Sequence, residues 1–196
     1  MTAPWRCFVA VPLDAELRLE LERARARLRA THPTLDDSWR WTVPAEWHVT
    51  LAFLGETDPT GIGRLTDAIE AVAAPRDAFI LPTGELGVFP SPRAARVLWY
   101  GVHDPDGSLA VAIEELREAL GLDPGPVHPH VTLARARHRH GAIADALLEG
   151  PPMPRGRLSV DRVRLYRSHT GAGPARYEVV AESILGGGLN GSRPAR

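Results

Sequence analysis

The chain has 196 residues, 44% of them hydrophobic, which allows one domain or two small lobes with a substantial core. A net charge of −1 excludes the general basic field of a non-specific DNA-binding protein, and a single cysteine, Cys7, excludes a disulfide framework. Without a signal peptide or a run of about 18 apolar residues, we expect a cytoplasmic protein that does not cross a membrane.

The first half of the chain predicts two helices between three strands. In order, we expect a strand at 7–11, a helix at 15–30, a loop at 31–41, a strand at 48–54, a helix at 60–73, a strand at 79–86 and a loop at 87–93. The first helix is well defined, because Asp14 offers an N-cap and Leu17, Leu21 and Leu28 recur at helical spacing.

The second half repeats this order. We expect a strand at 96–102, a helix at 108–120, a strand at 130–136, a short helix at 142–148, a hairpin of strands at 158–168 and 176–185 with its turn at 171–174, and a frayed tail at 186–196. Strand, helix, strand, helix, strand therefore occurs twice, beginning at Phe8 and again near Trp99. This duplication predicts two similar lobes, about 1–90 and 91–185, that face one another across a cleft.

One tetrapeptide, His-Val-Thr-Leu, occurs at residues 48–51 and again at 130–133, each time within an expected strand. Residues i and i+2 of a strand point to the same face, so the histidine and threonine of each copy project together while the valine and leucine face a core. The four projecting residues are His48, Thr50, His130 and Thr132.

Two histidines and two hydroxyls together suit acid–base chemistry on a phosphate ester. With pKa values near 6.5, one imidazole can be neutral while the other is protonated at physiological pH. The neutral one can activate a nucleophile and the charged one can protonate a leaving oxygen. The threonine hydroxyls can donate hydrogen bonds to phosphate oxygens. This scheme requires no metal.

A group of four histidines offers an alternative, a zinc site. Its members are His128, His130, His138 and His140. Two observations weigh against zinc. No acidic residue lies between Asp123 and Asp145 to orient a ligand, and the interleaved arginines at 135, 137 and 139 would repel a cation.

Arg135 stands closest to the second motif and could contact an anion, although strict alternation turns it away from His130. Only a bulge, a twist or the length of its side chain would bring it to the site. A base-stacking platform is a second candidate feature, with core packing as the default for each of its members. These aromatic residues are Phe8, Trp41, Trp47, Trp99 and Tyr100. We expect Cys7 to be a small buried core residue.

With their flanking sequences, the two motifs resemble those of the 2H phosphoesterases. The chain is most similar to the bacterial and archaeal RNA 2′,3′-cyclic phosphodiesterases, historically called 2′-5′ RNA ligases. The resemblance covers about residues 6–185. Its main segments are 6–10, 47–56, 87–90, 96–99 and 129–135, together with Tyr166, Ser168, Gly173 and Tyr177.

The resemblance implies an α+β fold of two pseudo-symmetric lobes, each with an antiparallel sheet and helices, in which strands can exchange between lobes. It implies hydrolysis of RNA 2′,3′-cyclic phosphate ends to 2′-phosphates without cofactor or metal, and reversible 2′-5′ joining of RNA ends. We expect a monomer without an obligate protein partner. Another cyclic phosphate, a 2′-5′ oligonucleotide, or RNA-end binding without turnover are the alternatives.

The resemblance also assigns roles to individual residues. His48 corresponds to the proton donor to the leaving 3′ oxygen, and His130 to the proton acceptor from water. Thr50 and Thr132 correspond to residues that hold the phosphate, and Arg135 matches a position that contacts substrate phosphate. We add Phe8 as a candidate substrate contact. The segment 31–41 matches no family pattern, so base preference is left open.

Overall fold

The computed structural model describes residues 3–138, 153–169 and 175–186. His140, the short helix expected at 142–148, the turn expected at 171–174 and all but the first residue of the expected tail lie outside these ranges.

The elements are β1 (Trp5–Pro12), α1 (Ala15–Thr31), α2 (Leu35–Ser38), β2 (Trp39–Trp41), the short turn η1 (Pro44–Glu46), β3 (His48–Thr57), η2 (Pro59–Gly61), α3 (Ile62–Ala73), β4 (Phe79–Phe89), η3 (Pro92–Ala94), β5 (Val97–Val102), α4 (Ser108–Ala119), β6 (His130–Ala136), β7 (Gly156–Val160), β8 (Arg162–His169) and β9 (Arg176–Ile184). Within the described ranges, the strand, helix and strand that open each predicted copy are present as β1, α1 and β3 and as β5, α4 and β6.

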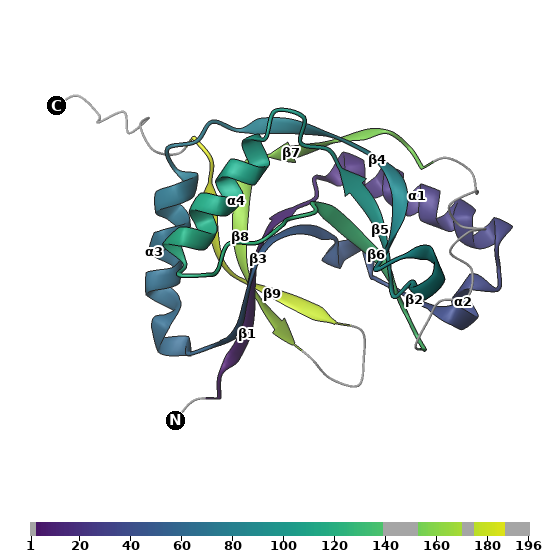
Figure 1. Ribbon diagram of the computed structural model, residues 1–196, viewed down its shortest axis with the longest axis horizontal. Helices are drawn as coiled ribbons and strands as arrows, with labels where there is room; N and C mark the ends of the chain where they lie inside the picture. The colour runs from purple at the N-terminus through teal and green to yellow at the C-terminus, as the bar shows by residue number, and fades with distance from the viewer. Residues whose placement is uncertain (1–2, 139–152, 170–174, 187–196) are drawn as a thin grey trace.

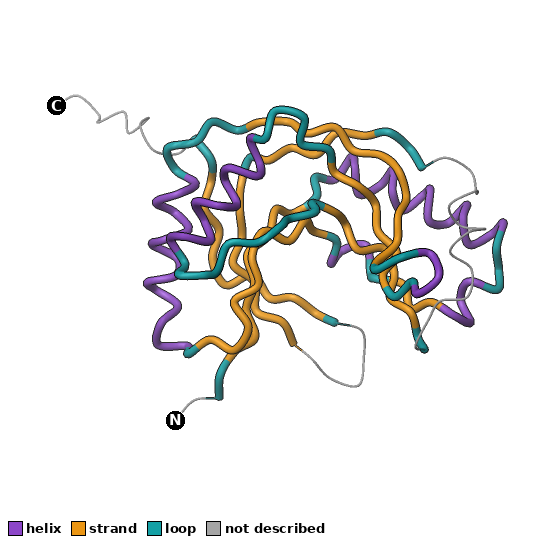
Figure 2. Tube along the Cα trace, in the orientation of Figure 1, coloured by secondary structure: helices purple, strands orange, loops and turns teal. Residues whose placement is uncertain are grey.

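The strands form one antiparallel sheet in the order β7-β4-β5-β6-β3-β1-β8-β9, with β2 beside β6. The sheet curls into an arch with an open concave side (Figures 1 and 2). The predicted α+β class is confirmed, and the two sheets expected for the lobes are halves of this one sheet, which meet where β3 pairs with β6. Strands are exchanged: β4 joins β5 to β7, whereas β8 and β9 join β1 and β3.

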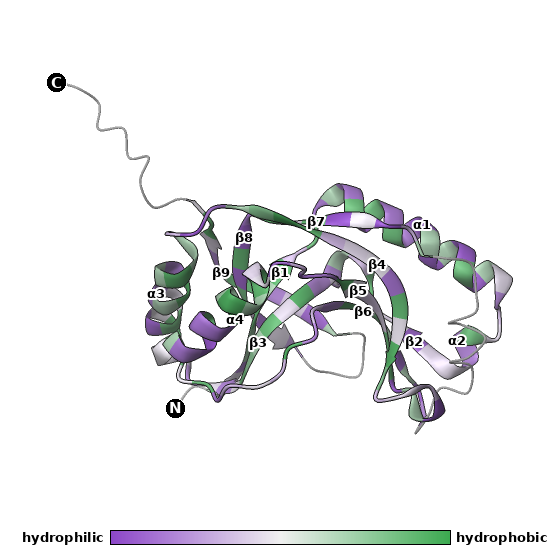
Figure 3. Cartoon of the chain, turned by 45° about the horizontal axis from the view of Figure 1, so that its top comes forward, coloured by the Kyte–Doolittle hydropathy of each residue, from purple (hydrophilic) through white to green (hydrophobic). Residues whose placement is uncertain are grey.

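Helices cover the outer side of the arch. α3 and α4 pack against each other and on the half that contains β8 and β9, whereas α1 packs beside β7 on the other half (Figure 1). In α1, the Asp14 carboxylate accepts the Leu17 N–H at 2.8 Å, as an N-cap should. Hydrophobic and hydrophilic residues alternate along this helix (Figure 3), and Leu17, Leu21 and Leu28 are buried. No helix in the described ranges is long and apolar enough to span a membrane.

Three segments differ from the sequence prediction. The loop expected at 87–93 begins later, because residues 87–89 continue β4 and pair with β5. The loop expected at 31–41 contains α2 and β2, because Trp39 is fully buried beside Leu98 and Ala134 and its strand pairs with β6. The single strand expected at 158–168 is two strands, because the chain changes partner from β4 to β1 at Asp161. The last two features depend on residues far away in the sequence.

Candidate active site

The two His-x-Thr segments lie at the centre of the sheet, on β3 and β6. The residues that follow each histidine, Val49 and Val131, are directly opposite one another and fully buried. Because the two strands are antiparallel, this register sets the histidine of each motif beside the threonine of the other. One buried valine pair therefore brings the two copies of the motif together.

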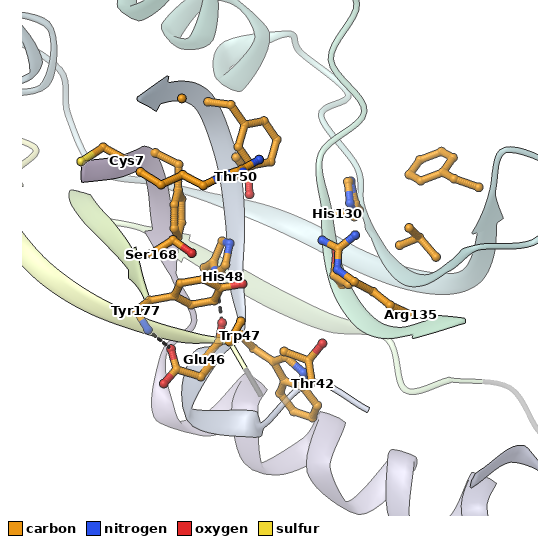
Figure 4. A pocket seen from close by; sticks show the side chains of 18 residues that line it. Cys7, Thr42, Glu46, Trp47, His48, Thr50, His130, Arg135, Ser168 and Tyr177 are labelled. Carbon is orange, nitrogen blue, oxygen red and sulfur yellow. Dashed lines mark hydrogen bonds between the residues drawn. The ribbon is translucent and has the colours of Figure 1, made fainter. Parts of the chain in front are cut away.

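All six predicted site residues line one open cavity of about 700 Å³ (Figure 4). Its lining includes residues from β1 and β3 of one half and from β5 and β6 of the other, so the cavity lies between the two halves. Its lining comprises Arg6, Cys7, Phe8, Thr42, Glu46, Trp47, His48, Thr50, Phe53, Gly55, Phe89, Val97, His130, Thr132, Arg135, Ser168, Ala175 and Tyr177.

Both imidazoles are oriented by the same backbone contact. Nδ1 of His48 lies 2.8 Å from the carbonyl oxygen of Glu46, and Nδ1 of His130 lies 2.6 Å from that of His128. Because a carbonyl oxygen only accepts, each Nδ1 carries the proton and donates it. Each Nε2 is therefore the ring nitrogen left to exchange a proton with a bound molecule.

Burial is the main influence on both histidines. The pKa of His48 is lowered from 6.5 to about 4: burial is the largest cause, the charges of His130 and Arg135 act in the same direction, and the hydrogen bond to Glu46 opposes them. Burial also lowers the pKa of His130, with His128 and Arg135 adding to the effect. At neutral pH, both imidazoles of the unliganded protein are therefore neutral.

A β-bulge follows each His-x-Thr segment. Leu133 has no partner on β5, and Leu51 has none on β1. The extra residue reverses the alternation, so that Leu133 and Ala134 are both buried while Arg135 lines the cavity. The bulge that Arg135 needed in order to reach the site is therefore present, and its guanidinium points into the cleft (Figure 4).

The same device turns Phe53 into the cavity. Phe53 is 73% exposed and occupies, after the first bulge, the position that Arg135 occupies after the second. Sequence reasoning missed Phe53, although a signal was available: it stands three residues after Thr50, as Arg135 stands three residues after Thr132. An exposed aromatic ring beside a phosphate-sized polar site can stack on a base.

Phe8, a predicted substrate contact, is only 4% exposed. Its ring lies 4.8 Å from that of His48, stacks on Tyr166 at 5.1 Å and meets the edge of Tyr177 at 5.0 Å. These rings surround the imidazole and account for its burial. Direct contact between Phe8 and a substrate stays a prediction.

Glu46 and Tyr177 are further cavity residues that sequence reasoning did not select for the site. Oε2 of Glu46 accepts the backbone N–H of Tyr177 at 3.0 Å, which ties β9 to the segment before β3 (Figure 4). The Tyr177 ring then meets that of His48 edge-on at 5.1 Å. Local patterns gave no signal, because 131 residues separate the two partners.

The default assignments to the core are confirmed for several residues. Trp47, Trp99, Tyr100 and Cys7 are buried, and burial raises the pKa of the Cys7 thiol. The rings of His128 and His130 lie 6.4 Å apart, and no group of three or more potential metal ligands occurs within the described ranges. His140, one member of the alternative zinc cluster, lies outside them.

Comparison with known proteins gives a consistent result. Residues 11–99 match the family model described as LigT-like phosphoesterase. The chain is 32% identical over 148 residues to the RNA 2′,3′-cyclic phosphodiesterase of Aeropyrum pernix, covering 70% of this chain and 83% of that protein. It is also 32% identical over 193 residues to the protein of that name from Geobacillus stearothermophilus, covering 94% of this chain but only 58% of the relative's length.

Solved structures extend this similarity to the fold. The structure of Escherichia coli LigT complexed with 3′-AMP is 28% identical to this chain and has a TM-score of 0.73. The match covers 93% of this chain and 98% of that one. From the conserved sheet, the paired motifs and these relatives together, the chain belongs to the family of LigT-like phosphoesterases and RNA 2′,3′-cyclic phosphodiesterases.

Proposed function

We propose that this chain hydrolyses the 2′,3′-cyclic phosphate at the end of an RNA to a 2′-phosphate, and joins RNA ends weakly and reversibly through a 2′-5′ linkage. The observation that carries the proposal is the convergence of both His-x-Thr pairs and Arg135 on one cavity. Relatives named RNA 2′,3′-cyclic phosphodiesterase and the 3′-AMP complex of a similar protein support the substrate class.

In the proposed reaction a water molecule attacks phosphorus and the bond from phosphorus to the 3′ oxygen breaks. Nε2 of His130 accepts the proton of the water, and Nε2 of His48 donates a proton to the departing 3′ oxygen. Thr50, Thr132 and Arg135 bind the non-bridging oxygens as their charge increases. The scheme uses neither a metal nor a nucleotide cofactor.

The proton on His48 has to arrive with the substrate. A donor must be protonated, yet burial lowers the pKa of this imidazole to about 4. An anionic phosphate close to both histidines favours their charged forms and raises their pKa values. The aromatic walls around His48 exclude water and strengthen this attraction. Substrate binding and proton uptake are therefore coupled in the proposed mechanism.

An oligoribonucleotide that ends in a 2′,3′-cyclic phosphate tests the proposal. The purified protein is incubated with it, with and without EDTA, and the product is identified by mass and by phosphatase treatment. A 2′-phosphate formed equally under both conditions is expected. Turnover that EDTA abolishes would contradict the two-histidine scheme, and an unchanged oligonucleotide would contradict the activity. We also propose that the protein is cytoplasmic and monomeric. A monomer is sufficient because one chain supplies every site residue, and light scattering measures its mass in solution.

A further inference from the structure

Arg40 is an additional arginine on the concave face of the sheet. It is directly opposite Arg135 in the pairing of β2 with β6. Directly opposed residues share a face, with Cβ atoms about 4.5–5.5 Å apart. Arg135 lines the cavity, and so does Thr42. Thr42 follows Arg40 by two residues in the extended chain, so the two side chains face the same side. Arg40 therefore stands at the rim of the cavity beside Arg135.

The acidic residues near this arginine pair contact other groups: Glu46, which lines the same cavity as Arg135, accepts the Tyr177 N–H. Both arginine side chains are exposed, and neither forms an ion pair within residues 3–138, 153–169 and 175–186. The carboxylate of Asp36 in α2 binds Arg29 instead.

Arg137, the residue after the end of β6, adds a third positive charge. Its Nε donates to the backbone carbonyl oxygens of Asp36 and Trp39. Like charges opposed across a ladder destabilise a sheet, so fold stability does not explain the pair.

We propose that Arg40 binds the phosphodiester on the 5′ side of the terminal nucleotide, so that the cleft prefers polynucleotide ends to cyclic mononucleotides. This inference rests on the proposed function. In a 2′,3′-cyclic end both the 2′ and the 3′ oxygens are bonded to the reacting phosphorus. The strand can therefore continue only through the 5′ oxygen, and its next phosphate is on that side. Two adjacent guanidinium groups, Arg135 at the reacting phosphate and Arg40 at the next, match this arrangement.

The opposite rim of the cavity suits a second phosphate less well. A neighbouring hollow of about 540 Å³ shares Arg6 with the main cavity. Its basic residues have acidic neighbours: Glu56 lies in the same lining, and Glu178 is 3.7 Å from Arg167 and 2.8 Å from His169. Two of the basic residues there, Arg167 and His169, contact Glu178, whereas Arg40 forms no ion pair within the part of the chain that the structure describes.

A pair of small substrates isolates the second phosphate. One is a nucleoside 2′,3′-cyclic phosphate and the other is the same compound with a 5′-phosphate. We expect wild-type kcat/KM to favour the 5′-phosphorylated compound by about tenfold, the value of one charge-assisted contact. Arg40→Gln should bring this ratio close to one. Arg23→Gln, a change at an exposed arginine of α1 on the outer side, is the matched control and should retain the wild-type ratio.

A wild-type ratio near one, or an Arg40→Gln variant with the wild-type ratio, would overturn the inference. If the wild-type protein hydrolyses neither these compounds nor the oligoribonucleotide with a 2′,3′-cyclic phosphate end, the proposed function fails and binding tests Arg40 separately. The dissociation constant of a labelled oligoribonucleotide with a 2′-phosphate end is then measured against salt concentration. Loss of one phosphate contact lowers the logarithmic slope by about 0.7 in Arg40→Gln, whereas Arg40→Lys should retain it. An unchanged slope in Arg40→Gln overturns the inference.

Discussion

The two halves of the cleft present the same motif on the same backbone. In each half a histidine donates from Nδ1 to the carbonyl two residues earlier, and a β-bulge follows the threonine-leucine pair. The two halves meet where β3 pairs with β6, at the buried residues Val49 and Val131. The positions of the reactive groups are therefore fixed by repetition of one local arrangement.

The surroundings of the two histidines are different. His48 lies among the aromatic rings of Phe8, Tyr166 and Tyr177. Around His130, the nearest rings are those of Phe89 and Trp99 at 5.1 and 6.3 Å, and the neighbouring groups that lower its pKa are His128 and Arg135.

This difference shows that a shared backbone geometry does not set the proton affinity of an imidazole, which depends on its neighbours. His48, enclosed by three aromatic rings, has a pKa of about 4, and the pKa of His130 is lowered as well. Whichever imidazole donates a proton must therefore acquire it as the anionic substrate binds.

The largest expected effect comes from removing either histidine. His48→Ala and His130→Ala should each lower kcat for cyclic phosphate hydrolysis by about 10²–10⁴-fold, because each removes one proton transfer. If the halves act as a unit, the double variant should cost little more than either single one. Single-turnover rates of the three variants measure this.

The control for these variants is His103→Ala, the same change at an exposed histidine outside the cavity lining. It should hydrolyse at the wild-type rate. Full activity in either His48→Ala or His130→Ala would exclude the two-histidine mechanism, whatever the double variant does.

The next effect is on stability in acid. The His48 pKa is about 4 in the folded protein against 6.5 when exposed, so between these values the unfolded chain binds more protons. The free energy of unfolding is unaffected above pH 6.5 and falls as the pH drops toward 4, by at most about 3 kcal/mol. His48→Gln should remove this part of the pH dependence, and His130→Gln less of it. The free energy of unfolding of both variants is measured by urea denaturation at pH 4 to 7. A larger change in its pH dependence for His130→Gln than for His48→Gln would contradict the prediction that His48 is the more strongly perturbed histidine.

Sequence patterns were sufficient to predict the four motif residues, because alternation in a strand is a local rule. They could not predict the direction of Arg135 or select Phe53. Both orientations depend on bulges, and a bulge is set by register with a neighbouring strand rather than by the residues themselves. The pairing of Glu46 with Tyr177 was likewise beyond local reasoning.

The fold divides in the same way. The α+β class, the order of elements and the first helix followed from periodicity and capping, and the structure confirms them. Strand β2 did not follow from these local patterns. It has three residues, and its order comes from pairing with β6 and from burial of Trp39. The division of the last long strand at Asp161 depends on two different partner strands.

Removing a threonine hydroxyl should cost less than removing a histidine. Thr50→Val and Thr132→Val keep the strand-forming shape but lose a hydrogen bond to a charged oxygen. Each should lower kcat/KM by an amount that corresponds to about 1.5–3 kcal/mol of transition-state stabilisation. Equal losses would mean that the phosphate is held symmetrically between the halves. A larger loss at Thr132, next to Arg135, would place the developing charge on the His130 side. Thr66→Val on α3, outside the cavity lining, is the control; its hydroxyl donates to the Ile62 carbonyl.

The smallest effect concerns the residues that precede each histidine by two positions. Glu46 and His128 both offer a backbone carbonyl to an imidazole, and an alanine at either position retains it. Their side chains differ: Glu46 accepts the Tyr177 N–H, whereas His128 packs on Trp99 at 4.7 Å. Glu46→Ala should therefore cost about 1 kcal/mol of unfolding free energy, with Glu46→Gln recovering most of it.

The His48 pKa in these variants, measured by NMR titration, decides what Glu46 does. Suppose that Tyr177 encloses the imidazole only because Glu46 holds β9 in place. In Glu46→Ala, water then enters beside the ring and the His48 pKa should rise toward 6.5. In Glu46→Gln, the amide oxygen still accepts the Tyr177 N–H and the pKa should remain low. A direct effect of the carboxylate charge predicts the opposite, a lower pKa in both variants, because each removes a negative group that favours the imidazolium. The direction of the shift in Glu46→Ala therefore separates positioning by the hairpin from electrostatics.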